Sequence, residues 1–172
     1  MRTVKFVCFL LALVFLPISV NGAKKDHTYG SFKGVHYVKN YDGDTITVNI
    51  PGVHPIIGSD MMIRIRGIDT PEMKAGCPAE LEKARQAKKM VRSLLRSAKQ
   101  INLHKVGRGK YFRIIADVEF DGKDLGAILV KNGLAVDGYN GGKKTHDWCA
   151  GSDSFKLENV ITQGKKVLRW TN

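Results

Sequence analysis

Three stretches of this chain alternate apolar and polar residues, and this pattern commits much of the fold to β-structure. In the first stretch, Ile46, Val48 and Ile50 alternate with polar residues. A period of two places successive side chains on opposite faces, which is typical of a half-buried strand. The expected strands are a hairpin over residues 34–50 and single strands over 61–68, 101–106 and 110–120.

A second pattern is helical and begins at Pro78, since proline is favoured in the first turn of a helix. Apolar residues recur every three or four positions from Leu81 to Ala98, which is the spacing of one helix face. Shorter helices are expected over residues 124–133, which end in a glycine, and over residues 153–163.

Together these elements predict an α+β fold that is rich in β-structure. Several strands with one long inserted helix fit a small closed barrel against which about three helices pack, and an OB-fold five-stranded barrel is one such design. The open face of an OB-fold often binds strands of nucleic acid.

Asp44 begins one of the apolar rows and is the residue that fits it least. By parity, its carboxylate lies on the same face as Ile46 and Val48. An unpaired charge buried there would cost several kcal/mol. Asp44 could accept a hydrogen bond from a nearby backbone amide in the turn at Asp42 and Gly43, or it could face a cation. This stretch alone leaves both interpretations open.

A second acidic group follows the strand expected at residues 61–68. Asp69 and Glu72 come after Gly67, and Pro71 stiffens the turn between them. Carboxylates at two strand ends, with arginines nearby, suit metal-assisted cleavage of a phosphodiester, because a hard cation such as calcium takes oxygen ligands. A further carboxylate can orient or deprotonate water, and arginines can stabilise the developing charge. An ordinary turn before a helix would explain this group equally well when it is taken alone.

The first 22 residues have the pattern of a secretory signal peptide. A basic start with Arg2 and Lys5 precedes an apolar run and then small residues. The run is short for an uncleaved membrane anchor, which is the alternative. We expect cleavage after Gly22, a secreted or periplasmic protein, and no stable membrane anchor. The expected parts are a signal peptide at 1–22, a flexible lead-in at 23–33 and one domain at 34–172.

The chain is strongly basic, with a formal net charge of +12 over 172 residues. The expected signal peptide holds two basic and no acidic residues, so its removal leaves 150 residues with a charge of +10. Such a surplus favours a polyanionic partner, for example nucleic acid, an anionic membrane surface or an acidic polysaccharide.

Two cysteines, Cys77 and Cys149, remain after the expected cleavage. In an exported chain they most simply form one disulfide, which could contribute about 4 kcal/mol because it closes a long loop. A zinc site with His146 is the alternative, but it has too few candidate ligands and no closely spaced cysteine pair.

Three motifs, in this order, resemble the staphylococcal nuclease (thermonuclease) family. They are DGDT at 42–45, RIRGIDTPE at 64–72 and KYFRIIADVEFDGKDLGAILVKNGLA at 110–135. The resemblance covers about residues 33–139, with a weaker similarity as far as Trp170. It implies an OB-fold and a monomeric, calcium-dependent nuclease that cleaves DNA and RNA with little sequence preference. Single-stranded or locally opened substrates are expected.

The same resemblance implies a role for each matching acidic residue. Asp44 and Asp69 match carboxylate ligands of Ca2+, and Thr70 matches the residue that binds the ion through its backbone carbonyl. Glu72 matches the residue usually assigned as the general base. Asp42 matches an acid near the metal that is not a direct ligand.

Two arginines match the phosphate-binding pair of the family. Arg64 lies five residues before Asp69, as the first arginine of the family's pair does. Strand parity puts Arg64 and Arg66 on the same face and does not choose between them. Arg113 stands two residues after Tyr111 and matches the second one, which leaves Arg108 as a loop or backbone-contact residue.

The resemblance also implies contacts with the nucleotide. Lys110 and Tyr111 match residues that touch its end phosphate, and Tyr139 matches a tyrosine beside the base pocket. The best-known member of the family has a second tyrosine where this chain has Gly141, and it lacks the cysteine pair. Stacking on an aromatic ring contributes about 1–3 kcal/mol per base, so a different base preference is expected.

Two other classes of function would use part of this sequence. A catalytically inactive OB-fold protein could bind nucleic acid without cutting it, but such a protein tends to lose some of the acidic and arginine residues that are all present here. A cationic surface-binding protein would use the charge and would not need three positioned carboxylates. We therefore expect a metal-dependent phosphodiesterase.

Overall fold

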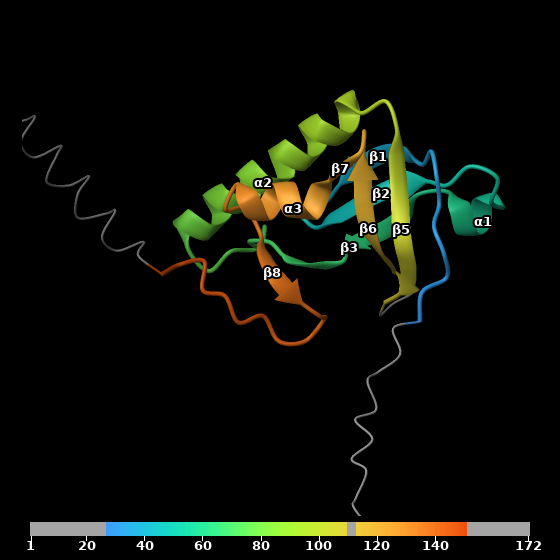
Figure 1. Ribbon diagram of the computed structural model, residues 1–172. Coiled ribbons are helices and arrows are strands. Elements are labelled where there is room, and N and C mark those ends of the chain that lie inside the picture. Colours follow the sequence, from blue (N-terminus) through green and yellow to red (C-terminus); the bar gives the residue numbers. More distant parts are fainter. Residues whose placement is uncertain (1–26, 110–112, 151–172) are drawn as a thin grey trace, which may run out of the picture.

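The computed structural model of the chain describes residues 27–109 and 113–150 (Figure 1). The expected signal peptide, the helix expected over 153–163 and the residues Lys110 and Tyr111 lie outside this range. Within it, no helix is long and apolar enough to cross a membrane.

The main sheet has five strands in the spatial order β1-β2-β3-β6-β5, and the short strand β7 pairs with β6. The β3–β6 pair is parallel and the other pairs are antiparallel. The strands are β1 (His36–Asn40), β2 (Thr45–Asn49), β3 (Met61–Ile65), β5 (Ile101–Arg108), β6 (Ile114–Phe120) and β7 (Lys123–Asp124). This arrangement confirms the predicted fold class and most of the expected strands.

The segment before β1 joins the two ends of the sheet. Phe32 and Leu103 of β5 exchange two backbone hydrogen bonds of 2.8 and 2.9 Å, and Val35 donates one to Ile101. In Figure 1 this blue segment runs beside β5. Residues 29–33, which fall in the expected flexible lead-in, are therefore paired with β5.

One strand that was expected at 61–68 is divided in the structure. Gly67 has φ +75°, a conformation that glycine adopts without a steric penalty. There the chain leaves the main sheet and forms β4 (Gly67–Asp69), which pairs with β8 (Val136–Tyr139). This division of the expected strand into β3 and β4 was not predicted. It moves β4 out of the main sheet and into a pair with β8.

Three helices complete the described part of the fold. They are α1 (Pro55–Gly58), a single turn that was not predicted, α2 (Pro78–Ser97) and α3 (Leu125–Lys131). The expected apolar stripe of α2 is buried at Ala84, Ala87, Val91 and Leu95. Figure 1 shows α2 and α3 side by side over one part of the sheet, and α3 ends before Gly133, as expected.

Gly43 lets the β1–β2 turn approach α2 closely. A Cβ atom there would lie 2.8 Å from Ala87 Cβ and 3.0 Å from Thr70 Cγ2. The turn that carries Asp42 and Asp44 therefore has a fixed distance from the helix and from Thr70.

We expect Gly43→Ala to lower the free energy of unfolding by about 1–3 kcal/mol, because an added methyl group overfills this contact. Denaturant unfolding measures the change. Gly142→Ala is the matched control, since its Cβ would meet only Asn140 Oδ1, at 3.4 Å. An equal effect of the two substitutions would show that the close approach is not restrictive.

Candidate active site

The candidate site forms where β2 begins and β4 ends. Asp44 directly precedes β2 and Asp69 ends β4, and these side chains are buried to 1% and 3% exposure. Thr45 pairs with Arg64 across β2 and β3, and Ile65 donates a backbone hydrogen bond to the carbonyl of Asp44. The sheet register therefore brings the backbone of Asp44 next to that of Arg64 and Ile65.

Arg64 bridges the two buried carboxylates. Its Nη1 pairs with Asp44 Oδ1, and its Nη2 lies 3.3 Å from Asp69 Oδ1. The same Nη2 donates to the carbonyl of Ile68 at 3.2 Å. The Tyr139 ring covers the guanidinium, with its centroid 5.1 Å from Cζ. These contacts fix the direction of Arg64 and place Tyr139 at the site.

The other partners of Asp44 explain how its carboxylate tolerates burial. Asp44 Oδ2 accepts from the amide of Thr70 at 3.1 Å and from its hydroxyl at 2.8 Å, and Thr45 Oγ1 donates to Oδ1. Both sequence interpretations are thus present in part, because Asp44 binds a backbone amide and a cation. The amide belongs to Thr70 and not to the β1–β2 turn.

Asp42 stabilises the β1–β2 turn. Its Oδ1 accepts from the amides of Asp44 and Thr45 at 3.1 and 2.8 Å. Burial raises the pKa of the Asp42 carboxyl, and hydrogen bonds from Thr45 with the positive charges of Arg64 and Lys144 offset this only in part.

Lys144 enters the same site from the segment after β8. Its ammonium lies 2.7 Å from Asp69 Oδ1, pairs with Glu72 Oε1 and lies 3.5 Å from the carbonyl oxygen of Thr70. Burial by itself would lower the pKa of Lys144. The hydrogen bonds and negative charges of Asp69 and Glu72 together outweigh this effect, so the pKa of Lys144 lies above its usual value. Sequence reasoning missed this residue, because nothing distinguishes Lys144 from Lys143.

The donor groups around this ammonium fit a hard divalent cation. A carboxylate of Asp69, a carboxylate of Glu72 and the carbonyl of Thr70 all point at one positive centre, and such oxygen donors are the ligands that calcium takes. Asp44 contacts both Arg64 and Thr70 and would have to exchange one of these contacts to join them. Lys144 stands in for a cation at the position where the sequence predicts a metal.

Glu80 holds the turn that carries Glu72. It lies in the first turn of α2, where its two carboxylate oxygens accept from the amides of Glu72 and Gly76 at 3.1 and 2.9 Å. Its own amide contacts the Sγ of Cys77, the residue that caps the helix. Sequence reasoning also missed Glu80, although a glutamate three residues after a helix cap is a known signal.

Cys77 and Cys149 form a disulfide, with Cα atoms 6.0 Å apart. The alternative zinc site is therefore wrong, because both sulfur atoms are consumed. His146 instead packs edge-on against the Trp148 ring, with centroids 4.3 Å apart. The bond ties the segment after β8 to the start of α2.

Arg113 lies directly before β6 and contacts none of the site carboxylates within the described residues. In the parallel β3–β6 pair, Arg64 is opposite Ile115, so Arg113 lies on the same face as Arg64, two residues earlier. Its Nε is buried and has no hydrogen-bond partner in the described part of the chain. A buried donor without an acceptor is unusual in a folded protein.

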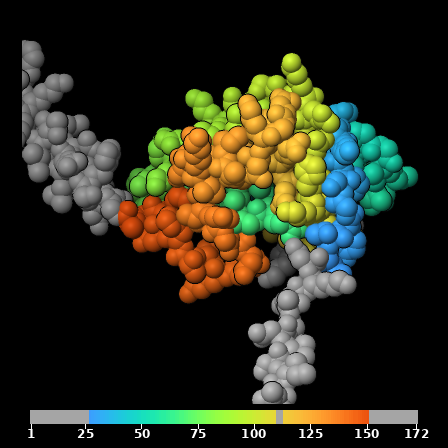
Figure 2. All heavy atoms as spheres, viewed as in Figure 1, coloured from blue at the N-terminus to red at the C-terminus, as the bar shows by residue number. Residues whose placement is uncertain are grey.

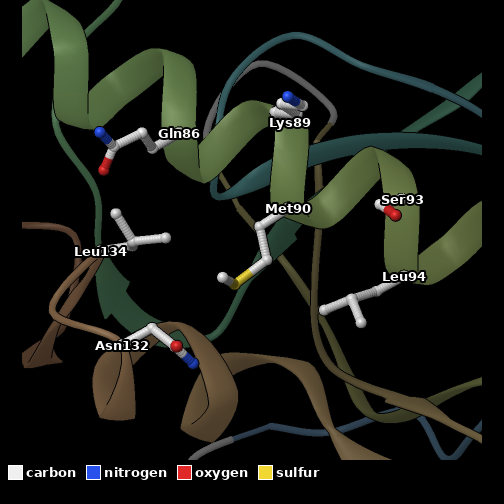
Figure 3. A pocket seen from close by; sticks show the side chains of 7 residues that line it. All are labelled: Gln86, Lys89, Met90, Ser93, Leu94, Asn132 and Leu134. Carbon is white, nitrogen blue, oxygen red and sulfur yellow. The ribbon is translucent and has the colours of Figure 1, made fainter.

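A separate groove of about 530 Å³ lies between α2 and the chain after α3 (Figure 3). Met90 and Leu94 point from α2 into this space, and Asn132 and Leu134 face them (Figure 3). No carboxylate lines the groove, so the chemistry of the buried acids is located elsewhere.

A comparison with protein families agrees with this geometry. The model described as staphylococcal nuclease homologue matches residues 62–151, which is more than half of the chain. The chain belongs to the staphylococcal nuclease family. This family has the OB-fold, and its members are usually hydrolases that act on nucleic acids.

The match includes Arg64, Asp69 and Glu72 but begins after β2, so Asp44 lies outside it. No curated protein gave a match to the chain. The roles of the individual residues therefore depend on the geometry of the site and on the motifs, and they stay predictions.

We expect a protein that lacks residues 1–22, and hence Cys8, to show no free thiol when it is titrated after denaturation without reductant. Replacing Cys77 and Cys149 together by serine should lower the free energy of unfolding by about 4 kcal/mol, because the bond closes a loop with a sequence separation of 72 residues. Two titratable thiols would contradict the disulfide.

Glu80→Gln should lower the free energy of unfolding by about 1–3 kcal/mol, since an amide nitrogen replaces one of two acceptors and leaves a donor of the turn unpaired. Chemical denaturation tests this. The control is Glu82→Gln on the same helix, where Glu82 has only an exposed contact with Gln86, and a change within about 0.5 kcal/mol is expected. If the two variants lose equal stability, Glu80 does not hold the turn.

Proposed function

We propose that the protein is a calcium-dependent nuclease that hydrolyses the phosphodiester bonds of DNA and RNA with little sequence preference. It acts as a monomer, secreted or periplasmic after removal of the signal peptide. The convergence of Asp44, Arg64, Asp69 and Glu72 from separate segments carries this proposal. The formal charge, +12 for the full chain and +10 after loss of residues 1–22, adds to the attraction for a polyanionic substrate.

Asp44, Asp69 and the carbonyl of Thr70 would hold the calcium ion. When bound, the ion neutralises the substrate phosphate and polarises it for attack. Asp69 and Thr70 are consecutive and supply two of these ligands from one turn. The β2–β3 register and the contact between Asp44 and Thr70 bring the third.

Glu72 would orient or deprotonate the attacking water. Its side chain is 46% exposed, so water and substrate can reach the carboxylate from solvent. The hydrogen bond from its own amide to Glu80 holds the backbone of the turn, and the Glu72 and Asp69 carboxylates both contact the Lys144 ammonium. The position of the group thus suits a general base.

Arg64 and Arg113 would bind the phosphate and the charge that develops on it. Arg64 is oriented by two carboxylates and a carbonyl, so the N–H groups that these contacts leave would meet an anion in a fixed direction. Arg113 is on the same face and has a buried Nε without an acceptor. The other guanidinium donors of Arg113 would bind a phosphate oxygen.

The nucleotide would lie beside Tyr139, which already stacks over Arg64. Lys110 and Tyr111 would contact its end phosphate. Because Gly141 provides no second ring, we propose that a base gains less from stacking here than in the best-known family member. Single-stranded or locally opened substrates fit an aromatic surface that needs an unstacked base.

Nicking of supercoiled plasmid, with calcium and then with chelator, tests the proposal. We expect nicked and linear DNA with calcium and none with excess chelator. Retention of DNA without cleavage under both conditions would favour the alternative, a catalytically inactive OB-fold protein that binds nucleic acid.

Arg113→Ala should lower kcat about 10²–10³-fold, the usual effect of removing one group that stabilises transition-state charge. Arg108→Ala should lower it less than about tenfold, since a contact with the substrate backbone affects mainly binding. Steady-state kinetics on single-stranded DNA, with unfolding curves for both variants, separates catalysis from stability. A reversed order of the two effects would show that the second phosphate-binding arginine is Arg108.

A further inference from the structure

Lys144 places a positive charge where the proposed function puts the calcium ion. Its ammonium contacts Asp69 and Thr70, two of the three groups predicted to hold calcium, and it also pairs with Glu72. Calcium binds oxygen at about 2.3–2.6 Å, and the ammonium already lies 2.7 Å from Asp69 Oδ1. Two cations cannot share these donors, because they would overlap and repel one another.

The segment that carries Lys144 is anchored at both ends. At one end, β8 pairs with β4, with Tyr139 opposite Gly67, and at the other end Cys149 is bonded to Cys77. We call residues 140–149 the strap. Figure 2 shows this dark-orange to red segment on the face below α3, and in Figure 1 it turns back from β8 toward the start of α2.

The strap reverses direction just before Lys144. Gly141 has φ +88°, which a glycine adopts readily, and the Tyr139 hydroxyl donates to the carbonyl of Gly142 at 3.1 Å. Farther along, the Trp148 ring is buried and lies 5.3 Å from Lys83 Nζ. These contacts and the disulfide hold Lys144 near the carboxylates, which gives its ammonium a high effective concentration at the site.

We propose that Lys144 is a built-in competitor for the metal, which must leave the acidic turn before a divalent ion binds and which thereby sets the affinity and selectivity of the site. This inference rests on the proposed calcium site. A monovalent ion in solution cannot match a tethered ammonium, whereas a divalent ion has twice the charge and can displace it at sufficient concentration. Calcium binding would also release Glu72 from its ion pair.

Isothermal titration of calcium into the chelator-treated protein tests the competition directly, without an activity measurement. Lys144→Met removes the ammonium and keeps an unbranched side chain. We expect its Kd for calcium to fall about tenfold or more, the factor that one charge-assisted hydrogen bond represents. Lys143→Met is the matched control, because Lys143 is exposed and has no ion pair among the described residues. Its Kd should stay within about twofold of the unchanged protein.

Thermal unfolding provides a second readout. Without calcium, Lys144→Met should have a lower Tm than the unchanged protein, because Asp69 and Glu72 lose their shared cation. Saturating calcium should raise its Tm by more than it raises that of the unchanged protein, since a tighter ligand stabilises the folded state further.

The role of the tether is tested with Cys77→Ser/Cys149→Ser in both backgrounds. Loss of the disulfide should lower the Kd for calcium when Lys144 is present and should not change it in Lys144→Met. Equal changes of the Kd for calcium with and without Lys144 would show that the disulfide does not act by holding Lys144 at the site.

An unchanged or higher Kd in Lys144→Met would overturn the competition while leaving the calcium site intact. If neither protein binds calcium, the metal part of the proposed function fails together with this inference.

Discussion

The geometry of the site depends on the pairing of one buried carboxylate with one arginine. Asp44 is almost completely enclosed, and its charge is compensated by Arg64 and by the amide and hydroxyl of Thr70. These partners come from β3 and from the turn after β4, so Asp44 is satisfied only when both are in place beside β2. Removing one partner of a buried ion pair destabilises the fold far more than the intact pair stabilises it, because the other charge is left buried and unpaired. The site and the sheet are therefore assembled together.

The same requirement limits how the site can accept a metal. Asp44 is held by Arg64, Thr45 and Thr70, whereas Asp69 and Glu72 share one ammonium that reaches them from a different segment. The ammonium is the more easily exchanged cation, because Lys144 is 35% exposed and Arg64 only 12%. A divalent ion would thus enter from the side of the acidic turn, and Arg64 would remain in place to meet a phosphate.

Much of this arrangement could be predicted from local patterns. The alternation around Ile46 predicted β2, and the apolar stripe predicted α2. The placement of Asp44 in a buried row indicated that its carboxylate needs a partner, either a backbone amide or a cation. The division of the strand at Gly67 could not be predicted, because it depends on a partner strand, β8, that is distant in sequence. The pairing of residues 29–35 with β5 has the same origin, since a short polar segment contains no local signal for a strand.

The position of Lys144 at the site could not be predicted from its local sequence. The residue is far from Glu72 along the chain, and a lysine beside two glycines is typical of a solvated loop. However, Lys144 precedes Cys149 by five residues, and Glu72 precedes Cys77 by the same number. The disulfide brings the two segments together, and their packing in three dimensions places Lys144 against Glu72. A covalent link between two loops can thus bring to a site a charge that no local pattern indicates.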